Sequence, residues 1–179
     1  MIVGLTGRAR SGKSTAANII SKAYGITEIA FADPLKEAAI HMFGITRDMA
    51  YGVNYNREEV VQPWGISVRT MLQKLGTECA RMVFQDDFWT VRADIEVESN
   101  PMYFDGFILT DVRFDNEAKW VADRGGVVIH LHRTVGGIGN EHASEKGVSG
   151  SLIDHHVPNE GTVADLEILL RGVLDGRNN

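Results

Sequence analysis

The sequence is poor in several features that each point to a class of protein. Its one cysteine, Cys79, excludes an internal disulfide and a cysteine zinc cluster, so a reducing, cytoplasmic setting is the simplest interpretation. No apolar run approaches the roughly 20 residues of a membrane span, so we expect no membrane association. The first residues, MIVGLTG, carry no basic leader, and we expect no signal peptide.

Positive charge is also scarce. The formal net charge at pH 7 is −6, so we expect no binding of nucleic acid or anionic lipid through bulk charge. Any phosphate site must therefore be built from a local cluster of lysine and arginine. With 179 residues, 44% of them hydrophobic, the chain is long and apolar enough for one domain with its own core.

Several common catalytic patterns are missing. The sequence contains no G-x-S-x-G, no H-E-x-x-H and no N-K-x-D, the pattern expected of a GTPase that reads guanine. His130 and His132 alternate along one predicted strand and share a face, but no third residue with suitable spacing completes a metal site. We interpret both as structural histidines.

Short apolar runs alternate with helical patterns, which predicts a three-layer α/β/α fold with a five-stranded parallel sheet. We expect a single domain over 1–179, with a helical region over 34–100. The apolar runs cover 2–6, 28–32, 107–110, 127–133 and 152–157. Helices are predicted from Lys13 onward and over 34–43, 67–84, 86–97, 115–124 and 162–175. The polar segment over 45–65 is interpreted as a loop or a small excursion.

The segment GLTGRARSGKST, residues 4–15, carries the clearest motif. Gly7, Gly12, Lys13 and Ser14 fit the pattern G-x-x-x-x-G-K-S/T between a predicted strand and a predicted helix. The glycines let backbone N–H groups turn toward a phosphate, and the positive end of the helix favours the same anion. Lys13 can reach the outer phosphates and Ser14 can ligate Mg²⁺. The motif predicts a nucleotide-phosphate site.

Asp111 is the expected partner of this loop. It follows the apolar run FILT, where a carboxylate can hold Mg²⁺ or its water. Without the loop, a helix cap or an ordinary loop aspartate would be the simpler explanation. Arg113 lies two residues further on, at the carboxyl end of the strand, where open α/β sheets bind ligands.

Two cations lie near predicted helix starts, where a bound anion would remove their conflict with the helix dipole. Lys36 lies with Asp33 in the first turn of one helix, and Arg69 in the first turn of another, each opposed by the helix dipole. Gln73 shares a helix face with Arg69. A solvated lysine, a capping aspartate and an exposed polar helix face are the alternatives.

The segment over 134–151 is rich in Gly, Ser, His and Glu, which indicates a mobile connection. Arg133 borders it and is either a cation of a closing lid or a surface arginine. His142, Ser144 and Glu145 form a polar cluster to which the pattern assigns no role.

The segments GRARSGKST, FADPLKEAA, WGISVRTMLQKLGTE, DVRFDNEA and HASE, with the closing pattern D-x-x-V-x-N-E-G-T, together resemble the phage deoxynucleoside monophosphate kinases. The resemblance spans Gly4 to about Leu170 and implies a P-loop kinase fold with a monophosphate-binding helical region and a short lid. It also implies the reaction: Mg-ATP and a deoxynucleoside 5′-monophosphate give ADP and the diphosphate. A host cytoplasm is the implied location.

The resemblance assigns residues to the two substrates. The lid lacks an arginine series, since only Arg133 borders it. Lys13, Arg10 and Arg113 would therefore stabilise the transferring group. Ser14 and Asp111 would place Mg²⁺. The role of Arg8 in catalysis stays open. The acceptor would meet Asp33, Lys36, Arg69 and Gln73, the last at its base. ATP would meet Gly7, Arg8, Ser11, Gly12, Lys13, Ser14, Thr15, Arg133 and Asn159, the last near adenine.

Two other functions stay open on the sequence. One is a P-loop kinase for another small acceptor, such as dephospho-coenzyme A, whose hydroxyl would need Asp33 as a base. The other is a nucleotide-dependent switch module, with slow hydrolysis and no small acceptor. The accepted nucleobases, the preference for deoxyribose and a homodimeric state are also left open.

Overall fold

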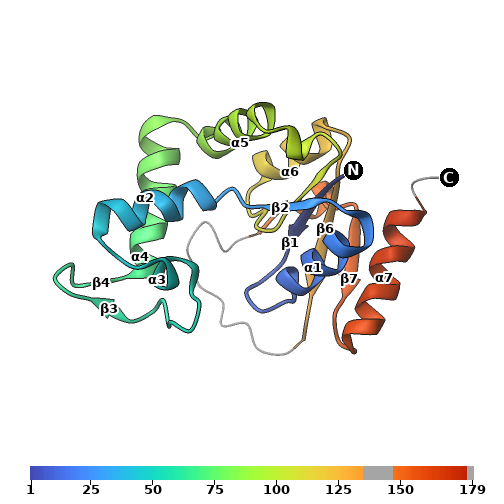
Figure 1. Ribbon diagram of the computed structural model, residues 1–179, viewed down its shortest axis with the longest axis horizontal. Coiled ribbons are helices and arrows are strands. Elements are labelled where there is room, and N and C mark those ends of the chain that lie inside the picture. The colour runs from blue at the N-terminus through green and yellow to red at the C-terminus, as the bar shows by residue number, and fades with distance from the viewer. Residues whose placement is uncertain (135–146, 177–179) are drawn as a thin grey trace. The chain divides into compact units, whose positions relative to one another are not determined.

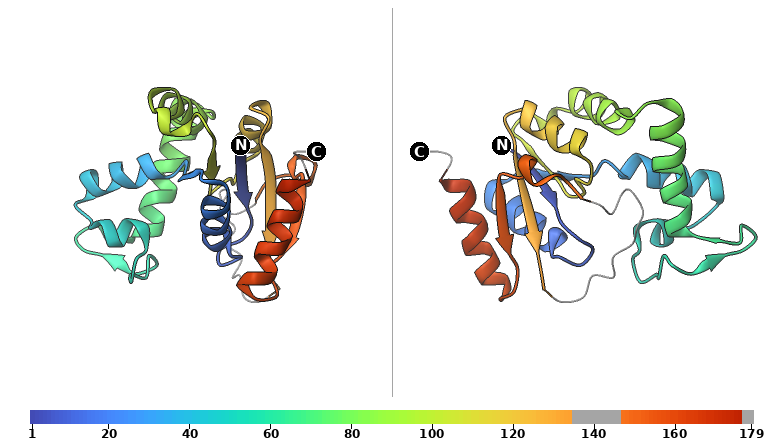
Figure 2. Two further views of the ribbon diagram at one scale, coloured as in Figure 1. Left: turned by 45° about the vertical axis from the view of Figure 1, so that its right-hand side comes forward. Right: turned by 180° about the vertical axis from the view of Figure 1, so that it is seen from behind.

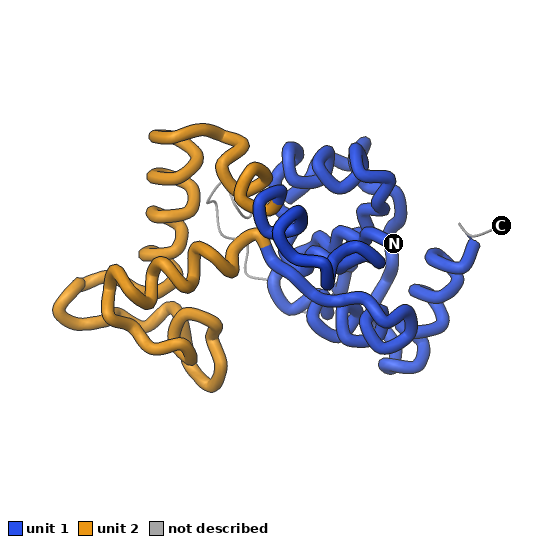
Figure 3. Tube along the Cα trace, turned by 45° about the horizontal axis from the view of Figure 1, so that its top comes forward, with its two compact units in different colours: residues 1–30, 94–179 blue, residues 31–93 orange. Residues whose placement is uncertain are grey.

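The computed structural model describes residues 1–134 and 147–176 (Figure 1). The chain forms two compact units, one of residues 1–30 with 94–179 and one of residues 31–93 (Figure 3). We call them unit 1 and unit 2. Within the described residues no helix is both long and apolar enough to cross a membrane.

Unit 1 is built on a five-stranded sheet in the order β2-β5-β1-β6-β7, and every neighbouring pair is parallel. The chain leaves β1 toward one edge of the sheet and later crosses to the other edge, so β1 lies at the point where the strand order reverses. In such sheets ligands bind at the carboxyl ends of the strands near that point. The strands are β1 (Ile2–Thr6), β2 (Thr27–Ile29), β5 (Phe107–Leu109), β6 (Val127–His132) and β7 (His155–Pro158).

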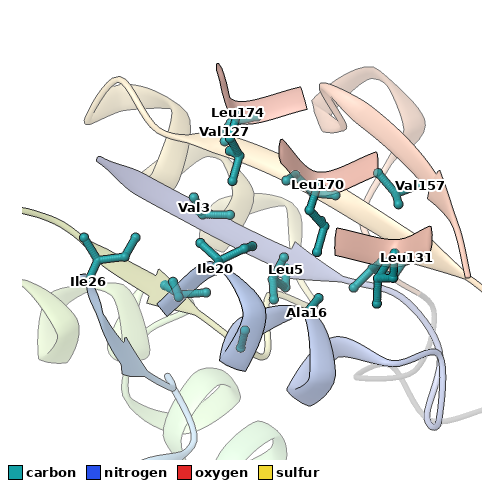
Figure 4. Packing of buried hydrophobic residues seen from close by; sticks show 14 residues of the cluster. Val3, Leu5, Ala16, Ile20, Ile26, Val127, Leu131, Val157, Leu170 and Leu174 are labelled. Carbon is teal, nitrogen blue, oxygen red and sulfur yellow. The ribbon is translucent and has the colours of Figure 1, made fainter. Parts of the chain in front are cut away.

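Helices cover both faces of this sheet. On one face α1 (Lys13–Tyr24) packs onto β1, and α7 (Val163–Asp175) packs against α1 and β7. Leu5, Ile20 and Leu170 belong to the buried cluster between these elements (Figure 4). In both further views α7 lies alongside β7 (Figure 2). On the other face lies α6 (Asp115–Asp123), because a Cβ at Gly4 would lie 3.1 Å from Val121. The predicted three-layer fold with a parallel sheet is confirmed.

Unit 2 is mainly helical. Its core is a cluster of Ala39, Ile45, Ala50, Val68 and Met71. Its elements are α2 (Asp33–Phe43), α3 (Arg47–Tyr51), the antiparallel strands β3 (Val60–Val61) and β4 (Ile66–Ser67), α4 (Val68–Gln73) and the π-helix η1 (Lys74–Phe84). The helix α5 (Phe88–Ser99) begins in this unit and ends in unit 1, where a short 3-10 turn, η2 (Pro101–Tyr103), follows.

The segment over 45–65, which we expected to be a loop or a small excursion, contains short regular elements. It contains α3, whose N-cap Thr46 accepts a hydrogen bond from Met49 N at 3.3 Å, and most of the β3–β4 hairpin. Trp64 anchors the hairpin by donating from Nε1 to the carbonyl of Phe43 at 2.9 Å. Strands of two residues leave no periodic pattern in the sequence, so tertiary packing decides their structure.

Two other predicted elements differ in detail. The helix predicted over 67–84 changes from α to π geometry at Lys74. The last strand predicted from residue 152 begins only at His155, after a 3-10 turn, η4 (Gly150–Leu152). The start of that strand is fixed by pairing with β6, where His155 lies opposite Ile129.

The turn that leads into β5 has room only for glycine at position 106. Gly106 has a φ of +129°, and a Cβ there would collide with the backbone of Met1, whose carbonyl accepts from Phe107 N at 3.0 Å. Gly106→Ala is therefore expected to lower the free energy of unfolding by about 1–3 kcal/mol in urea denaturation.

The matched control is Gly150→Ala, because a Cβ at Gly150 meets nothing within 4 Å. This control should stay within about 0.5 kcal/mol of the wild type. Equal effects of the two changes would contradict the explanation.

Candidate functional site

The glycine loop joins β1 to α1 in an unusual backbone conformation. Gly7 has a φ of 133°, Arg10 of 65° and Gly12 of 101°. Gly12 is the N-cap of α1, and no side chain caps the helix there. The N–H groups of the first turn therefore keep their capacity to donate to an anion.

Neighbouring strands leave little room for side chains at the two glycines. A Cβ at Gly7 would collide with the carbonyl oxygen of Leu131 in β6. A Cβ at Gly12 would collide with the side-chain amide of Asn159, which follows β7. Gly7 thus requires glycine for space as well as for backbone conformation, whereas at Gly12 the backbone conformation requires glycine and a side chain would displace the Asn159 amide.

Side chains hold the loop in shape. Lys13 Nζ donates to the carbonyls of Gly7 at 2.7 Å and Arg8 at 2.9 Å. Asn159 Nδ2 donates to the carbonyl of Ser11 at 2.9 Å, and Asn159 N donates to His132 O at 2.9 Å. Asn159, which the resemblance places near adenine, thus contacts the loop itself and ties it to the sheet.

Ser11 has a hydroxyl group without a hydrogen-bond partner among the described residues. Its side chain is buried, and its Oγ has no hydrogen-bond partner within residues 1–134 and 147–176. A buried hydroxyl without a partner costs folding free energy, which natural proteins accept chiefly at functional sites. The unpaired hydroxyl of Ser11 is thus consistent with the predicted phosphate loop.

Asp111 lies half-buried at the carboxyl end of β5. The backbone around it is fixed on both sides, because Thr110 N donates to Ile29 O and Val112 N donates to Leu5 O, each at 3.1 Å. Leu5 is the penultimate residue of β1, so the segment after β5 runs beside the start of the glycine loop. The parallel sheet thereby brings the predicted metal carboxylate to the edge that carries the loop.

The turn at Arg113 depends on a residue that the sequence reasoning missed. Glu117 is buried, and its Oε2 accepts from the backbone N–H of Arg113 at 2.7 Å and of Phe114 at 3.1 Å. Arg113 itself is exposed. The spacing of a capping box could have identified Glu117, but phenylalanine takes the place of the usual Ser or Thr N-cap.

Carboxylates also hold both borders of the predicted lid. Asp115 accepts from Ser149 N at 2.8 Å and Ser149 Oγ at 2.6 Å, and these bonds, the side-chain one foremost, lower the pKa of Asp115. Glu160 accepts from Thr134 N and Thr134 Oγ1, each at 2.6 Å. Residues 135–146, with His142, Ser144 and Glu145, lie outside the described residues.

The remaining unit 1 candidates are exposed. Arg8 and Arg10 project from the loop, Ser14 and Thr15 lie in the first turn of α1, and Arg133 follows β6. Their exposure leaves the side chains accessible to a ligand. No group of three or more His, Cys, Asp or Glu residues that could hold a metal occurs in the described part of the chain.

In unit 2 each predicted cation has an acidic partner. Lys36 pairs with Asp33 at 2.9 Å, and Arg69 Nε pairs with Glu58 Oε1 at 2.5 Å. One turn beyond Arg69, Gln73 Nε2 is buried and has no hydrogen-bond partner within the described residues. A buried amide donor without a partner is a candidate for recognising a polar ligand.

Arg81 is a buried residue that is ion-paired with Asp86. It is 5% exposed and donates from Nη1 to the carbonyl of Asp86 at 2.6 Å and to its carboxylate at 3.3 Å. Nearby, Trp89 Nε1 donates to Gly76 O at 2.8 Å. These bonds fasten the π-helix to the start of α5, so Arg81 is part of the framework of unit 2.

His130 lies beneath the glycine loop. It pairs in register with Thr6, the last residue of β1, and its ring centroid is 5.3 Å from that of His156 in β7. Burial, foremost, lowers the pKa of His130, and the nearby charges of His156, His132, Lys13 and Arg8 add to this effect. His130 is therefore neutral at pH 7.

Because the pKa of His130 is lowered, the free energy of unfolding should depend on pH. The unfolded chain binds a proton at this histidine below about pH 6.5, whereas the folded chain binds it only at lower pH. Stability should therefore fall as the pH drops below about 6.5, and His130→Gln should remove that part of the fall. Urea denaturation at about pH 7.5 and 5.5 measures the difference.

His41→Gln, at an exposed position of α2, is the control and should keep the wild-type pH dependence. An unchanged pH dependence in His130→Gln would show that this histidine does not carry the effect.

Comparison with known proteins agrees with the site. The family model for deoxynucleotide monophosphate kinase matches residues 53–169. A protein of Acanthamoeba polyphaga mimivirus whose name places it in that family is 30% identical, over 81% of this chain and 80% of its own. The deoxynucleotide monophosphate kinase of Enterobacteria phage T4 is 22% identical, over 97% of this chain and 98% of its own.

A solved structure supports the fold alone. The crystal structure of a protein from Thermus thermophilus covers 98% of this chain and 97% of its own, with a TM-score of 0.51 and 17% identity. The family match spans more than half of the chain and includes Arg69, Asp111, Arg113 and Asn159. The chain belongs to the deoxynucleotide monophosphate kinase family.

Proposed function

We propose that the chain transfers the γ-phosphoryl group of Mg-ATP to a deoxynucleoside 5′-monophosphate. The observation that carries the proposal is the preformed glycine loop with Lys13 folded over it, in a chain of this kinase family. Such a loop binds the donor phosphates, and a second anion site in unit 2 suits the acceptor. The relatives of phage and mimivirus origin support a host cytoplasm as the place of action.

The donor would bind at the carboxyl edge of unit 1. The uncapped first turn of α1 offers N–H groups to the phosphates, and Lys13 can exchange two loop carbonyls for phosphate oxygens. Arg10 and Arg113 are exposed beside this edge and would stabilise charge on the transferring group. Arg8 and Arg133 stay proposals for the outer part of the ATP site.

The residues at this edge fit Mg²⁺. This ion prefers oxygen ligands and is usually held by one or two carboxylates together with substrate phosphates. Ser14 offers an exposed hydroxyl in the first turn of α1, and Asp111 a half-buried carboxylate after β5. When bound with nucleotide, the ion supplies neutralisation of phosphate charge.

The acceptor would bind to unit 2. Asp33 holds the charged side chain of Lys36, and Glu58 holds that of Arg69. A phosphate dianion can compete with these carboxylates for cations that are already in position. The buried amide of Gln73 can donate to a carbonyl of the base.

The chemistry needs little more than positioning. An oxygen of the acceptor phosphate attacks the γ-phosphorus, and the bond to the β–γ bridging oxygen breaks, which leaves ADP. That acceptor oxygen is already anionic at neutral pH, so no strong general base is required. A hydroxyl acceptor would need one, and the carboxylate of Asp33 is engaged by Lys36.

Lys13→Ala tests the donor site. The change removes a cation from the transferring phosphates and should lower kcat by about 100- to 1,000-fold in a coupled ADP-release assay. Lys22→Ala, at an exposed position of the same helix, is the control and should keep the wild-type rate. A wild-type rate in a folded Lys13→Ala variant would refute the assignment.

Arg69→Ala tests the acceptor site. Loss of a charge-assisted hydrogen bond should raise the KM for the monophosphate by about tenfold or more, with a much smaller effect on the KM for ATP. Lys74→Ala, which breaks the exposed pair with Glu78 in the same unit, should change neither KM. Equal changes in both KM values for Arg69→Ala would count against its acceptor role.

A further inference from the structure

Lys36 is placed where its charge is poorly tolerated. It lies in the first turn of α2, an 11-residue helix whose positive end repels an ammonium group. Its side chain is only 17% exposed, so water stabilises the charge less than it would at the surface. Asp33 provides one compensating contact at 2.9 Å.

An aromatic ring provides the second contact. Lys36 Nζ lies 4.5 Å from the centroid of the Tyr51 ring, at the end of α3. The guanidinium of Arg47 lies 4.7 Å from the same centroid. The negative face of an aromatic ring attracts cations at such distances.

The ring is itself held in place. Tyr51 Oη donates to Glu37 Oε1 at 2.7 Å, and Arg47 Nη1 pairs with that same oxygen at 2.7 Å. Burial, foremost, and the hydrogen bond to Glu37 raise the pKa of Tyr51 to about 12, so the phenol remains a donor at neutral pH. Tyr51 also packs against the apolar cluster that contains Ala39 and Ala50.

The two partners of Lys36 differ in what they do to an incoming anion. The carboxylate of Asp33 cancels the charge of Lys36 and competes with a phosphate for its protons. The Tyr51 face attracts the ammonium group but carries no net charge. It does not compete with a phosphate as a hydrogen-bond acceptor for the N–H groups of Lys36. It can therefore hold Lys36 in one position both before and after a phosphate binds.

We propose that Tyr51 is a positioning residue for the acceptor, whose ring holds the Lys36 ammonium where it meets the monophosphate. This rests on the proposed role of Lys36 in acceptor binding. A free lysine side chain loses rotational freedom when it binds a ligand, and a preordered one has already lost it, which strengthens binding.

Tyr51→Leu is the direct test. Loss of the ring should raise the KM for the monophosphate by about three- to thirtyfold, while the KM for ATP stays within about twofold. Tyr51→Phe keeps the ring and should stay within about threefold of the wild type for both substrates. If Tyr51→Leu does not fold, Tyr51→Met, which keeps more of the buried volume, replaces it.

Two further variants separate positioning from packing. Tyr55→Leu alters a tyrosine that packs against the same apolar cluster, and it should leave the KM for the monophosphate unchanged. In a Lys36→Met background, Tyr51→Leu should add less than about twofold to that KM, because the group it positions is gone.

The outcomes are distinct. A wild-type chain that forms no diphosphate from any deoxynucleoside monophosphate would overturn the proposed function and this inference with it. If the wild type is active, any one of three results would overturn the inference alone. The first is that Tyr51→Leu leaves the KM for the monophosphate unchanged, and the second is that Tyr55→Leu raises this KM as much as Tyr51→Leu does. The third is that the effects of Tyr51→Leu and Lys36→Met on this KM multiply in the double variant.

Discussion

The close seating of the glycine loop against the sheet is the constraint on which the candidate site depends. Gly7 has no room for a Cβ because the Leu131 carbonyl lies there, and a Cβ at Gly12 would displace the Asn159 amide. That amide also binds the carbonyl of Ser11. Leu131 belongs to β6, which pairs with β1, and Asn159 follows β7, which pairs with β6, so the parallel sheet positions both contacts of the loop.

Several cations of the candidate site are also held in place by contacts within the protein. In a chain with a net charge of −6, three of the cations that we propose to bind phosphate already have an oxygen partner. Lys13 contacts loop carbonyls, Lys36 contacts Asp33, and Arg69 contacts Glu58. A phosphate dianion carries more negative charge than any one of these partners, so we expect a bound phosphate to displace them while the cations stay near their starting positions.

The sequence predicts the parts of this structure that rest on local patterns. Apolar runs that alternate with helical periodicity predict the parallel sheet, and the spacing from Gly7 to Ser14 predicts the loop between β1 and α1. The sequence singles out Lys36 because a lysine in the first turn of a helix is unfavourable for the helix dipole, and Asp33 lies in the same turn. Such signals are local because they arise from backbone geometry and from neighbours three or four residues apart.

The parts that escape prediction depend on contacts between distant segments. Tyr51 meets Lys36 across a region whose sequence is typical of a loop, and Glu117 takes its role from a turn capped by phenylalanine. The π-helix is fastened by Arg81 and Trp89, whose partners only the fold reveals. The residues that the sequence assigns to each substrate stay predictions until they are tested by mutation.

The central claim is that the second substrate is a deoxynucleoside monophosphate. The most direct measurement incubates the wild-type chain with Mg²⁺, ATP labelled on its γ-phosphate, and in turn each deoxynucleoside monophosphate and dephospho-coenzyme A. The label should appear in one or more deoxynucleoside diphosphates and depend on the added monophosphate. Label found only in phosphorylated dephospho-coenzyme A, or only in inorganic phosphate released without any acceptor, would contradict the account.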